Sequence, residues 1–249
     1  MGSVDGQVVL VFGASSGIGR ATATLFAQGG ASVAVAARRG STLAELAADL
    51  AVQGYTALAL PTDVSFRDQV DRAVATTVER FGRVDVLVNA AGLNTQHRRM
   101  SDLSQGDWER IVGINLTGAF NTTQAVLPAM RAQGGGLIVQ FSSVSGRWGD
   151  MSGPAYQASK HGVVGLCQAT MVEERLNGIR VTAILPGLVD TPILQNRLVP
   201  PSRETLDRAL QPEDLAQACV FLATLPARAY IPELIMMPPQ LQVVGQAMA

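Results

Sequence analysis

The stretch from Gln7 to Gly30 places a strand, a glycine-rich turn and a helix in immediate succession. Its first part, QVVLVF (7–12), is a run of β-branched and apolar residues that suits a strand buried on both faces. The turn GASSGIG (13–19) follows directly, and the helical pattern after it ends at Gly29-Gly30. Glycines let a backbone approach a pyrophosphate, and a helix N-terminus supplies N–H groups and a positive dipole end. Because the spacing G-x-x-x-G-x-G differs from the general dinucleotide motif, the flanking strand and helix give this interpretation its weight.

Strands and helices alternate along the rest of the chain. We expect further strands at residues 32–37, 55–60, 84–88, 137–141, 179–185 and 234–237, and further helices at 43–50, 70–81, 108–127, 154–177 and from 212 onward. Such an order implies right-handed βαβ units. With no linker or shift in composition, the predicted fold is a single α/β domain over residues 1–249. It is a Rossmann-type, doubly wound parallel sheet of about seven strands with helices on both faces. Residues 190–211 show little periodicity, so we expect a mobile flap over the site.

Composition excludes several classes of function. A chain of 249 residues with 47% hydrophobic residues can fill a large core. The net charge of −1 and the absence of a basic run argue against binding to nucleic acid or to an anionic membrane. We find no signal peptide and no apolar stretch of membrane-spanning length. Cys167 and Cys219 lie in apolar helical patterns, which fits a reducing cytoplasm, and neither they nor His97 and His161 have the spacing of metal ligands.

The end of the second strand bears on cofactor choice. In a Rossmann-type fold the adenosine ribose arrives there, and an acidic residue would bind the 2′-hydroxyl. This chain has Ala37 at that position, followed by Arg38 and Arg39. An arginine can pair with a 2′-phosphate, so we expect NADP(H) to be favoured, with NAD(H) possible. The alternative is that both arginines are merely solvated.

Tyr156 and Lys160 stand four residues apart in a segment whose first helical turn suits Pro154. Residues at this spacing share one helix face, so the phenol and the ammonium should point the same way. A nearby ammonium favours the phenolate, and we therefore expect Lys160 to lower the pKa of Tyr156 and to tune it for proton transfer. Ser143, at the end of the 137–141 strand, could bind the same substrate oxygen. Taken alone, the pair could equally be a solvated helix face.

Two further segments place polar or small residues near strand ends. Asn115 lies midway along the expected helix 108–127, where asparagine is a poor helix former. It is either a satisfied core amide or a kinked spot that presents polar groups inward. The turn Asn89-Ala90-Ala91-Gly92 follows the 84–88 strand, and its small residues would let a flat ring lie close to the backbone.

These motifs together resemble the classical short-chain dehydrogenases/reductases. The resemblance covers residues 6 to about 237, and it rests on the order and spacing of Gly13-xxx-Gly17-Ile18-Gly19, Asp63-Val64, Asn89-Ala90-Ala91-Gly92, Asn115, Ser143, Tyr156-xxx-Lys160 and Pro186-Gly187. It implies an oxidoreductase that interconverts a ketone or aldehyde and an alcohol by hydride transfer. It also implies a small-molecule substrate and a homodimer or homotetramer.

The resemblance assigns roles to individual residues. The implied catalytic residues are Asn115, Ser143, Tyr156 and Lys160. The implied cofactor-binding residues are Gly13, Ser15, Ser16, Gly17, Ile18, Gly19, Arg38, Arg39, Asp63, Val64, Asn89, Ala90, Gly92, Tyr156, Lys160, Pro186, Gly187, Val189 and Thr191. Two features depart from the family: Phe12 replaces a usual threonine, and Met237-Pro238-Pro239-Gln240 replaces the usual C-terminal motif, which leaves the usual assembly open.

The substrate pocket is predicted from residues that flank the catalytic groups. Ser143 and Tyr156 would contact the substrate, and Trp148, Leu188 and Leu194, with Met151, would form the wall or else the core of the flap. With no obvious charged anchor, this pocket favours a neutral, apolar carbonyl compound. Two alternatives remain: a catalytically idle dinucleotide-binding sensor on the same fold, and dehydratase or epimerase chemistry. The chain is short for the extra substrate domain that relatives with the latter chemistry usually carry.

Overall fold

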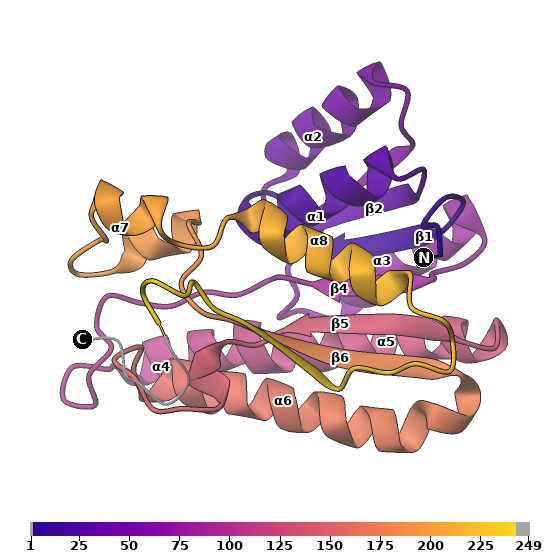
Figure 1. Ribbon diagram of the computed structural model, residues 1–249. Helices are drawn as coiled ribbons and strands as arrows, with labels where there is room; N and C mark the ends of the chain where they lie inside the picture. The colour runs from indigo at the N-terminus through magenta and orange to yellow at the C-terminus, as the bar shows by residue number, and fades with distance from the viewer. Residues whose placement is uncertain (1, 243–249) are drawn as a thin grey trace.

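The computed structural model describes residues 2–242 and contains one sheet of seven parallel strands. The strands are β1 Val8–Phe12, β2 Ser32–Ala37, β3 Ala57–Pro61, β4 Val86–Asn89, β5 Gly136–Phe141, β6 Ile179–Pro186 and β7 Glu233–Met236. Their order in the sheet is β3-β2-β1-β4-β5-β6-β7 (Figure 1). The chain therefore builds outward from β1 to β3, returns to β4 and continues the other way. This confirms the predicted doubly wound sheet.

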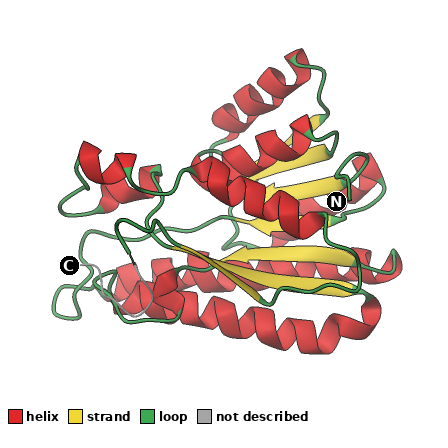
Figure 2. Ribbon diagram, viewed as in Figure 1, coloured by secondary structure: helices red, strands yellow, loops and turns green. Residues whose placement is uncertain are grey.

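Helices cover both faces of the sheet (Figure 2). The longer helices are α1 Gly17–Gln28, α2 Gly40–Val52, α3 Arg67–Phe81, α4 Gln105–Val112, α5 Gly118–Ala132, α6 Pro154–Glu174 and α8 Pro212–Ala223. Helices α1, α2 and α8 pack on one face, around Phe26 and Leu43, and helices α3, α5 and α6 pack on the other, around Val126 and Val163. Residues of β1 alternate between these two cores, as a strand buried on both faces requires.

The helix expected at 108–127 is longer and less regular than its sequence pattern indicates. It begins at Gln105, where Ser104 accepts a hydrogen bond from the Asp107 backbone N–H at 3.0 Å. The helical path then runs through a π-helical turn, Gly113–Thr117, into α5, which includes Pro128. Asn115 lies in this π turn, a form that is frequent at functional sites.

The segment 190–211, expected from the sequence to be a mobile flap, has local structure, and its mobility stays a prediction. It contains a 3-10 helix, Pro192–Asn196, and the short helix α7, Arg203–Asp207, and Val189 pairs with Leu210 in a single parallel bridge. These elements lie beyond the C-terminal ends of the strands (Figure 1).

The structure does not describe every residue of the predicted domain. Residue 1 and residues 243–249 lie outside the described part of the chain. Within residues 2–242, no helix is both long and apolar enough to cross a lipid bilayer.

Candidate active site

A cavity of about 950 Å³ lies at the C-terminal ends of the parallel strands. This is where open α/β sheets bind ligands, at the point where the strand order reverses. Loops after β1, β2, β4, β5 and β6 all contribute to its wall. Of the candidate site residues from the sequence, all except Asn89, Asn115 and Trp148 line this cavity.

The glycine-rich turn fits closely against the loop after β4. Gly13 adopts a φ of +80°, and a Cβ on it would lie 2.6 Å from the Ala91 backbone nitrogen. A Cβ on Gly19 would lie 2.4 Å from the Gly13 carbonyl oxygen, so side chains are sterically excluded at both positions. Ser16, before the first turn of α1, makes no side-chain capping hydrogen bond. The first N–H groups of α1 thus remain available at the cavity, which fits a bound pyrophosphate.

The adenosine end of the cavity is basic at the tip of β2. Ala37, Arg38 and Arg39 line it, and both arginines are exposed. Arg39 donates to the Ser15 hydroxyl and carbonyl oxygens at 3.0 and 3.2 Å, so it also fastens the glycine-rich turn. The Arg38 guanidinium has no hydrogen-bond partner among residues 2–242. A guanidinium without a protein partner suits a 2′-phosphate, and position 37 holds alanine instead of an acidic residue that would repel it. These residues therefore fit NADP(H).

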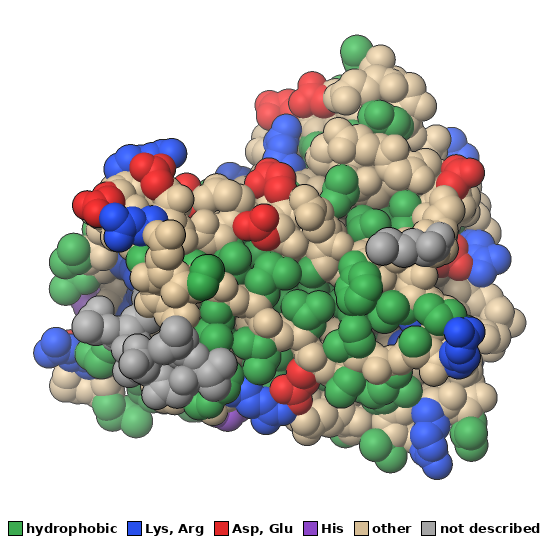
Figure 3. All heavy atoms as spheres, in the orientation of Figure 1, with side chains coloured by type: hydrophobic (Ala, Val, Ile, Leu, Met, Phe, Trp, Pro, Cys, Tyr) green, Lys and Arg blue, Asp and Glu red, His purple; other side chains and the backbone are tan. Residues whose placement is uncertain are grey.

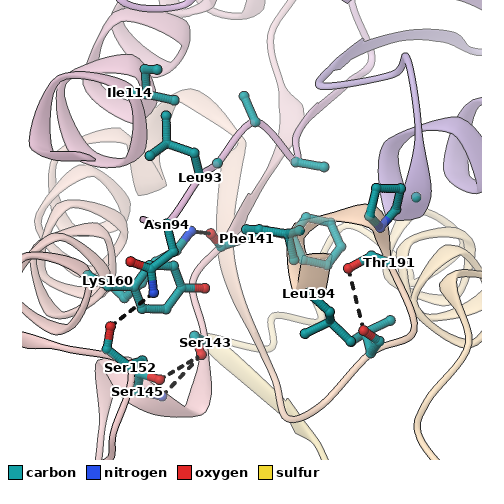
Figure 4. Close-up of a pocket in the computed structure, with 18 of the residues that line it drawn as sticks. Leu93, Asn94, Ile114, Phe141, Ser143, Ser145, Ser152, Lys160, Thr191 and Leu194 are labelled. Atoms are coloured by element: carbon teal, nitrogen blue, oxygen red, sulfur yellow. Dashed lines mark hydrogen bonds between the residues drawn. The ribbon is translucent and has the colours of Figure 1, made fainter. Parts of the chain in front are cut away.

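Tyr156, Lys160 and Ser143 meet on the opposite wall. Tyr156 lies in the first turn of α6 and Lys160 one turn later, and Ser143 follows β5. The Lys160 ammonium donates to the Phe141 carbonyl oxygen at 2.8 Å and lies 5.6 Å from the centroid of the Tyr156 ring. Figure 4 shows Lys160 and Ser143 on one side of the cavity, with Thr191 and Leu194 across from them. The solvated-face alternative is therefore excluded, because Lys160 is buried.

The electrostatics of this wall differ from the expectation. Desolvation raises the pKa of Tyr156, and its hydrogen bond to Ser143 only partly offsets that rise. Burial also lowers the pKa of Lys160, to about 8. The expected lowering of the Tyr156 pKa by Lys160 is not found, because the pKa is raised and Lys160 is not among the groups that shift it. The buried ammonium is itself disfavoured, and it is directed at the Phe141 carbonyl.

Asn115 and Asn89 lie behind the cavity wall. The Asn115 carboxamide accepts from the Leu93 N–H at 2.8 Å and donates to the Leu93 carbonyl at 3.0 Å and to the Ser159 hydroxyl at 3.1 Å. Asn89 donates to Gln140 at 2.8 Å and accepts from the Ala91 N–H at 3.1 Å. Both side chains therefore hold the loop after β4 in place. A Cβ on Gly92 would lie 3.5 Å from both the Asn115 Oδ1 and the Lys160 Nζ, so both groups lie beside the backbone of this loop.

The substrate end matches the sequence prediction only in part. Leu188, Leu194 and Met151 line the cavity, but Trp148 does not, which corrects its prediction as part of the pocket wall. The physical reason is the 3-10 turn Val144–Gly146, after which Arg147 forms an ion pair with Glu233 on β7. Arg147, the residue before Trp148, is thus bonded to the edge strand of the sheet.

Sequence patterns did not predict the charged residues at the substrate end of the cavity. Arg98, Arg197 and Asp150 line the cavity near Tyr156, so the prediction of a pocket without a charged anchor is wrong. Arg98 and Arg197 are half-buried, and burial lowers the pKa of each guanidinium. Both come from segments without periodicity, and the sequence offers no signal that brings them together.

Comparisons with known proteins agree with this geometry. Residues 7–199 match the family model described as short chain dehydrogenase. The chain is 38% identical over 234 residues to a 3-oxoacyl-[acyl-carrier-protein] reductase of Synechocystis sp., with 93% of this chain and 94% of the relative covered. A levodione reductase structure is similar with a TM-score of 0.87 and 32% identity, covering 93% of this chain and 96% of that one. A metagenomic short-chain oxidoreductase in complex with NADP is similar with a TM-score of 0.81 and 30% identity, covering 94% and 98%.

Proposed function

The chain belongs to the short-chain dehydrogenase family, and from this premise we propose that it reduces a carbonyl compound with NADPH, using Tyr156 as general acid. One observation supports this assignment above the others. Tyr156, Ser143 and the Lys160 ammonium lie on one wall of a cavity whose far end is formed by the glycine-rich turn. A bound NADP(H) supplies or accepts the hydride, and the protein supplies placement and the proton.

The Tyr156 phenol would act as the proton donor in reduction, because burial keeps it in the neutral form. A neutral phenol can donate a proton to a carbonyl oxygen, whereas a phenolate could only accept one. Ser143 lies within hydrogen-bonding reach of the phenol and would orient the same oxygen. Lys160, whose pKa is about 8, is mainly protonated at neutral pH and would bind the ribose hydroxyls of the cofactor. Asn115 would act from behind the wall, by fixing the backbone of Leu93 in the loop that lies beside Lys160.

The substrate is a small carbonyl compound with an apolar part. Leu188 and Leu194 would pack against that part, and both are buried at the cavity wall. The neutral character expected from the sequence rested on the absence of a charged group, and that premise does not hold. Dehydratase or epimerase chemistry has no separate observation in its favour.

A test is the oxidation of NADPH by the purified protein with a panel of ketones and aldehydes. Tyr156→Phe is expected to lose turnover and to keep its NADPH affinity, because only the proton donor is removed. Tyr55→Phe, which changes a tyrosine outside the cavity, should behave like wild type. Full activity of Tyr156→Phe would refute the role of Tyr156. NADPH binding without turnover of any compound would favour the idle sensor.

The homodimer or homotetramer expected from the family also belongs to this proposal. Figure 3 shows apolar side chains gathered over α8 and the sheet edge at β7, where Phe221 and Ile235 are 42% and 41% exposed. An apolar patch of this kind supports association between copies. Light scattering would measure the mass, and Phe221→Glu should reduce it. A cytoplasmic location stays a prediction.

A further inference from the structure

We propose that Arg98 and Arg197 form an anion-binding subsite that selects carbonyl substrates bearing a carboxylate. This inference rests on the proposed carbonyl reduction and names its substrate class. The two arginines are far apart in the sequence. One lies in the loop after β4 and the other follows the 3-10 helix Pro192–Asn196, yet both line the same end of the cavity.

Hydrogen bonds fix the position of the first arginine. The Arg98 Nε donates to the Thr95 carbonyl at 2.5 Å and Nη2 donates to the Asn196 carbonyl at 3.0 Å. The second bond spans the two segments and places Arg98 beside the residue that precedes Arg197. Because the bonds use Nε and Nη2, Nη1 keeps both of its N–H donors for a ligand.

The positive charge at this end of the cavity is not neutralised by an ion pair. Within residues 2–242, neither Arg98 nor Arg197 forms a salt bridge, although eight such pairs occur elsewhere. The Arg197 guanidinium has no hydrogen-bond partner in the same range. Each arginine is half-buried, and the charge of Arg197 further lowers the pKa of Arg98. Two like charges held close together and partly shielded from water suit a site that receives an anion.

The carboxylate of Asp150 determines the net charge of the subsite and therefore the charge of the anion that it can bind. It lines the same part of the cavity, but its Oδ2 accepts from the Ser145 hydroxyl at 2.5 Å and its Oδ1 accepts from the Ser152 N–H at 2.8 Å. Its carboxylate is thus held by the serine loop and forms no ion pair with either arginine. Two guanidinium groups and one carboxylate leave one net positive charge. That charge matches a carboxylate better than a phosphate dianion, which Asp150 would repel.

The subsite is close enough to the reacting groups to act on one small molecule. Both Arg98 and Arg197 exert an electrostatic effect on the Tyr156 phenol and lower its pKa. A substrate oxygen at Tyr156 and a carboxylate at the arginines would therefore belong to the same oxo acid. Leu194, buried on the segment that leads to Arg197, would contact the carbon skeleton between them.

The experiment compares 4-oxocyclohexanecarboxylate with its methyl ester, which has the same ring and the same carbonyl group but no charge. The measured quantity is the ratio of kcat/KM for the acid to kcat/KM for the ester. Wild type should prefer the acid, and Arg197→Gln should lower the ratio by about tenfold to a hundredfold, the usual effect of losing a charge-assisted hydrogen bond. Arg197→Lys should restore part of the preference. Arg110→Gln is the matched control, because it removes an exposed arginine on α4 that does not line the cavity.

Binding of the acid and the ester to the protein loaded with NADP⁺, measured by calorimetry, separates this inference from the proposed function. Weaker acid binding in Arg197→Gln without turnover in any variant would support the subsite and refute the reduction. Reduction of both compounds at equal kcat/KM by wild type would refute the subsite and leave the reduction standing. Faster reduction of dihydroxyacetone phosphate than of the acid would overturn the choice of a carboxylate.

Discussion

Replacement of Asn115 by alanine tests whether this residue braces the site through the loop after β4. The carboxamide forms three hydrogen bonds, two with the backbone of Leu93 and one with Ser159. Ser159 keeps a partner in the variant, because its hydroxyl also donates to the Tyr156 carbonyl at 2.7 Å. The Leu93 N–H and carbonyl, in a residue that is 7% exposed, would both lose their partner.

The expected loss of stability follows from these two backbone groups that are left without a hydrogen-bond partner. A buried polar group without a partner costs about 1–3 kcal/mol, so Asn115→Ala should lower the free energy of unfolding by about 2–6 kcal/mol. Water entering the vacated space would bring the value toward the lower end. Asn121→Ala is the matched control, because the Asn121 side chain, on the same helical run, makes one hydrogen bond, to the Val64 carbonyl at 2.8 Å. It should cost about half as much.

Urea unfolding followed by tryptophan fluorescence measures both variants. Asn115→Asp adds a second check, because a carboxylate cannot donate to the Leu93 carbonyl and should be at least as destabilising as alanine. If Asn115→Ala costs no more than Asn121→Ala, the bracing role is refuted. Asn115 would then be a replaceable polar residue in the π turn.

The other predictions concern the cofactor and the buried lysine. Arg38→Ala should weaken NADPH binding by about 1.5–3 kcal/mol and leave NADH binding unchanged, and equal losses in calorimetry would contradict a contact with the 2′-phosphate. Because the pKa of Lys160 is about 8 instead of 10.5, the unfolded chain binds more protons between these values, so this group makes the free energy of unfolding rise with pH across that window. Urea unfolding at several pH values should show that Lys160→Met lacks this rise, and the same slope in both proteins would refute the low pKa. Gly54→Ala should cost about 1–2 kcal/mol for its left-handed backbone alone, since nothing lies within 4 Å of the new Cβ. Gly13→Ala, with the same backbone strain, should cost more and abolish NADPH binding, and equal costs in urea unfolding would contradict the steric argument.

Local sequence patterns correctly predicted the strands and helices whose apolar residues recur at regular spacing. The strand at 7–12, the glycine-rich turn and the start of α6 at Pro154 follow from residue types that have few alternative structures. The pattern failed where a long-range contact decides the outcome. The helix expected to end at residue 127 continues through Pro128 to Ala132. Arg147, next to Trp148, pairs with Glu233 of β7, far along the chain, and Trp148 does not line the cavity.

The residues of the candidate site also differ in whether the sequence alone places them together. Tyr156 and Lys160 share a helix face, so their spacing alone places them together. Arg98 and Arg197 lie far apart in the sequence, and a hydrogen bond from the Arg98 side chain to the Asn196 carbonyl links their two loops. No periodicity records such a contact. The raised pKa of Tyr156 could not be predicted from the sequence either, because it depends on how completely the folded chain excludes water from the phenol.

The sheet order has a consequence for how the chain is made on the ribosome. Once residue 89 has emerged, β3, β2, β1 and β4 can pair in their final order, and the glycine-rich turn and Arg38 already belong to this half. Strands β5, β6 and β7 are then added one by one beyond β4, in the order of synthesis. At roughly 5–20 residues per second, translation of the remaining chain takes on the order of 10–30 seconds. During that interval the nascent chain exposes the outer edge of β4, whose length of four residues leaves little template for pairing with another nascent chain.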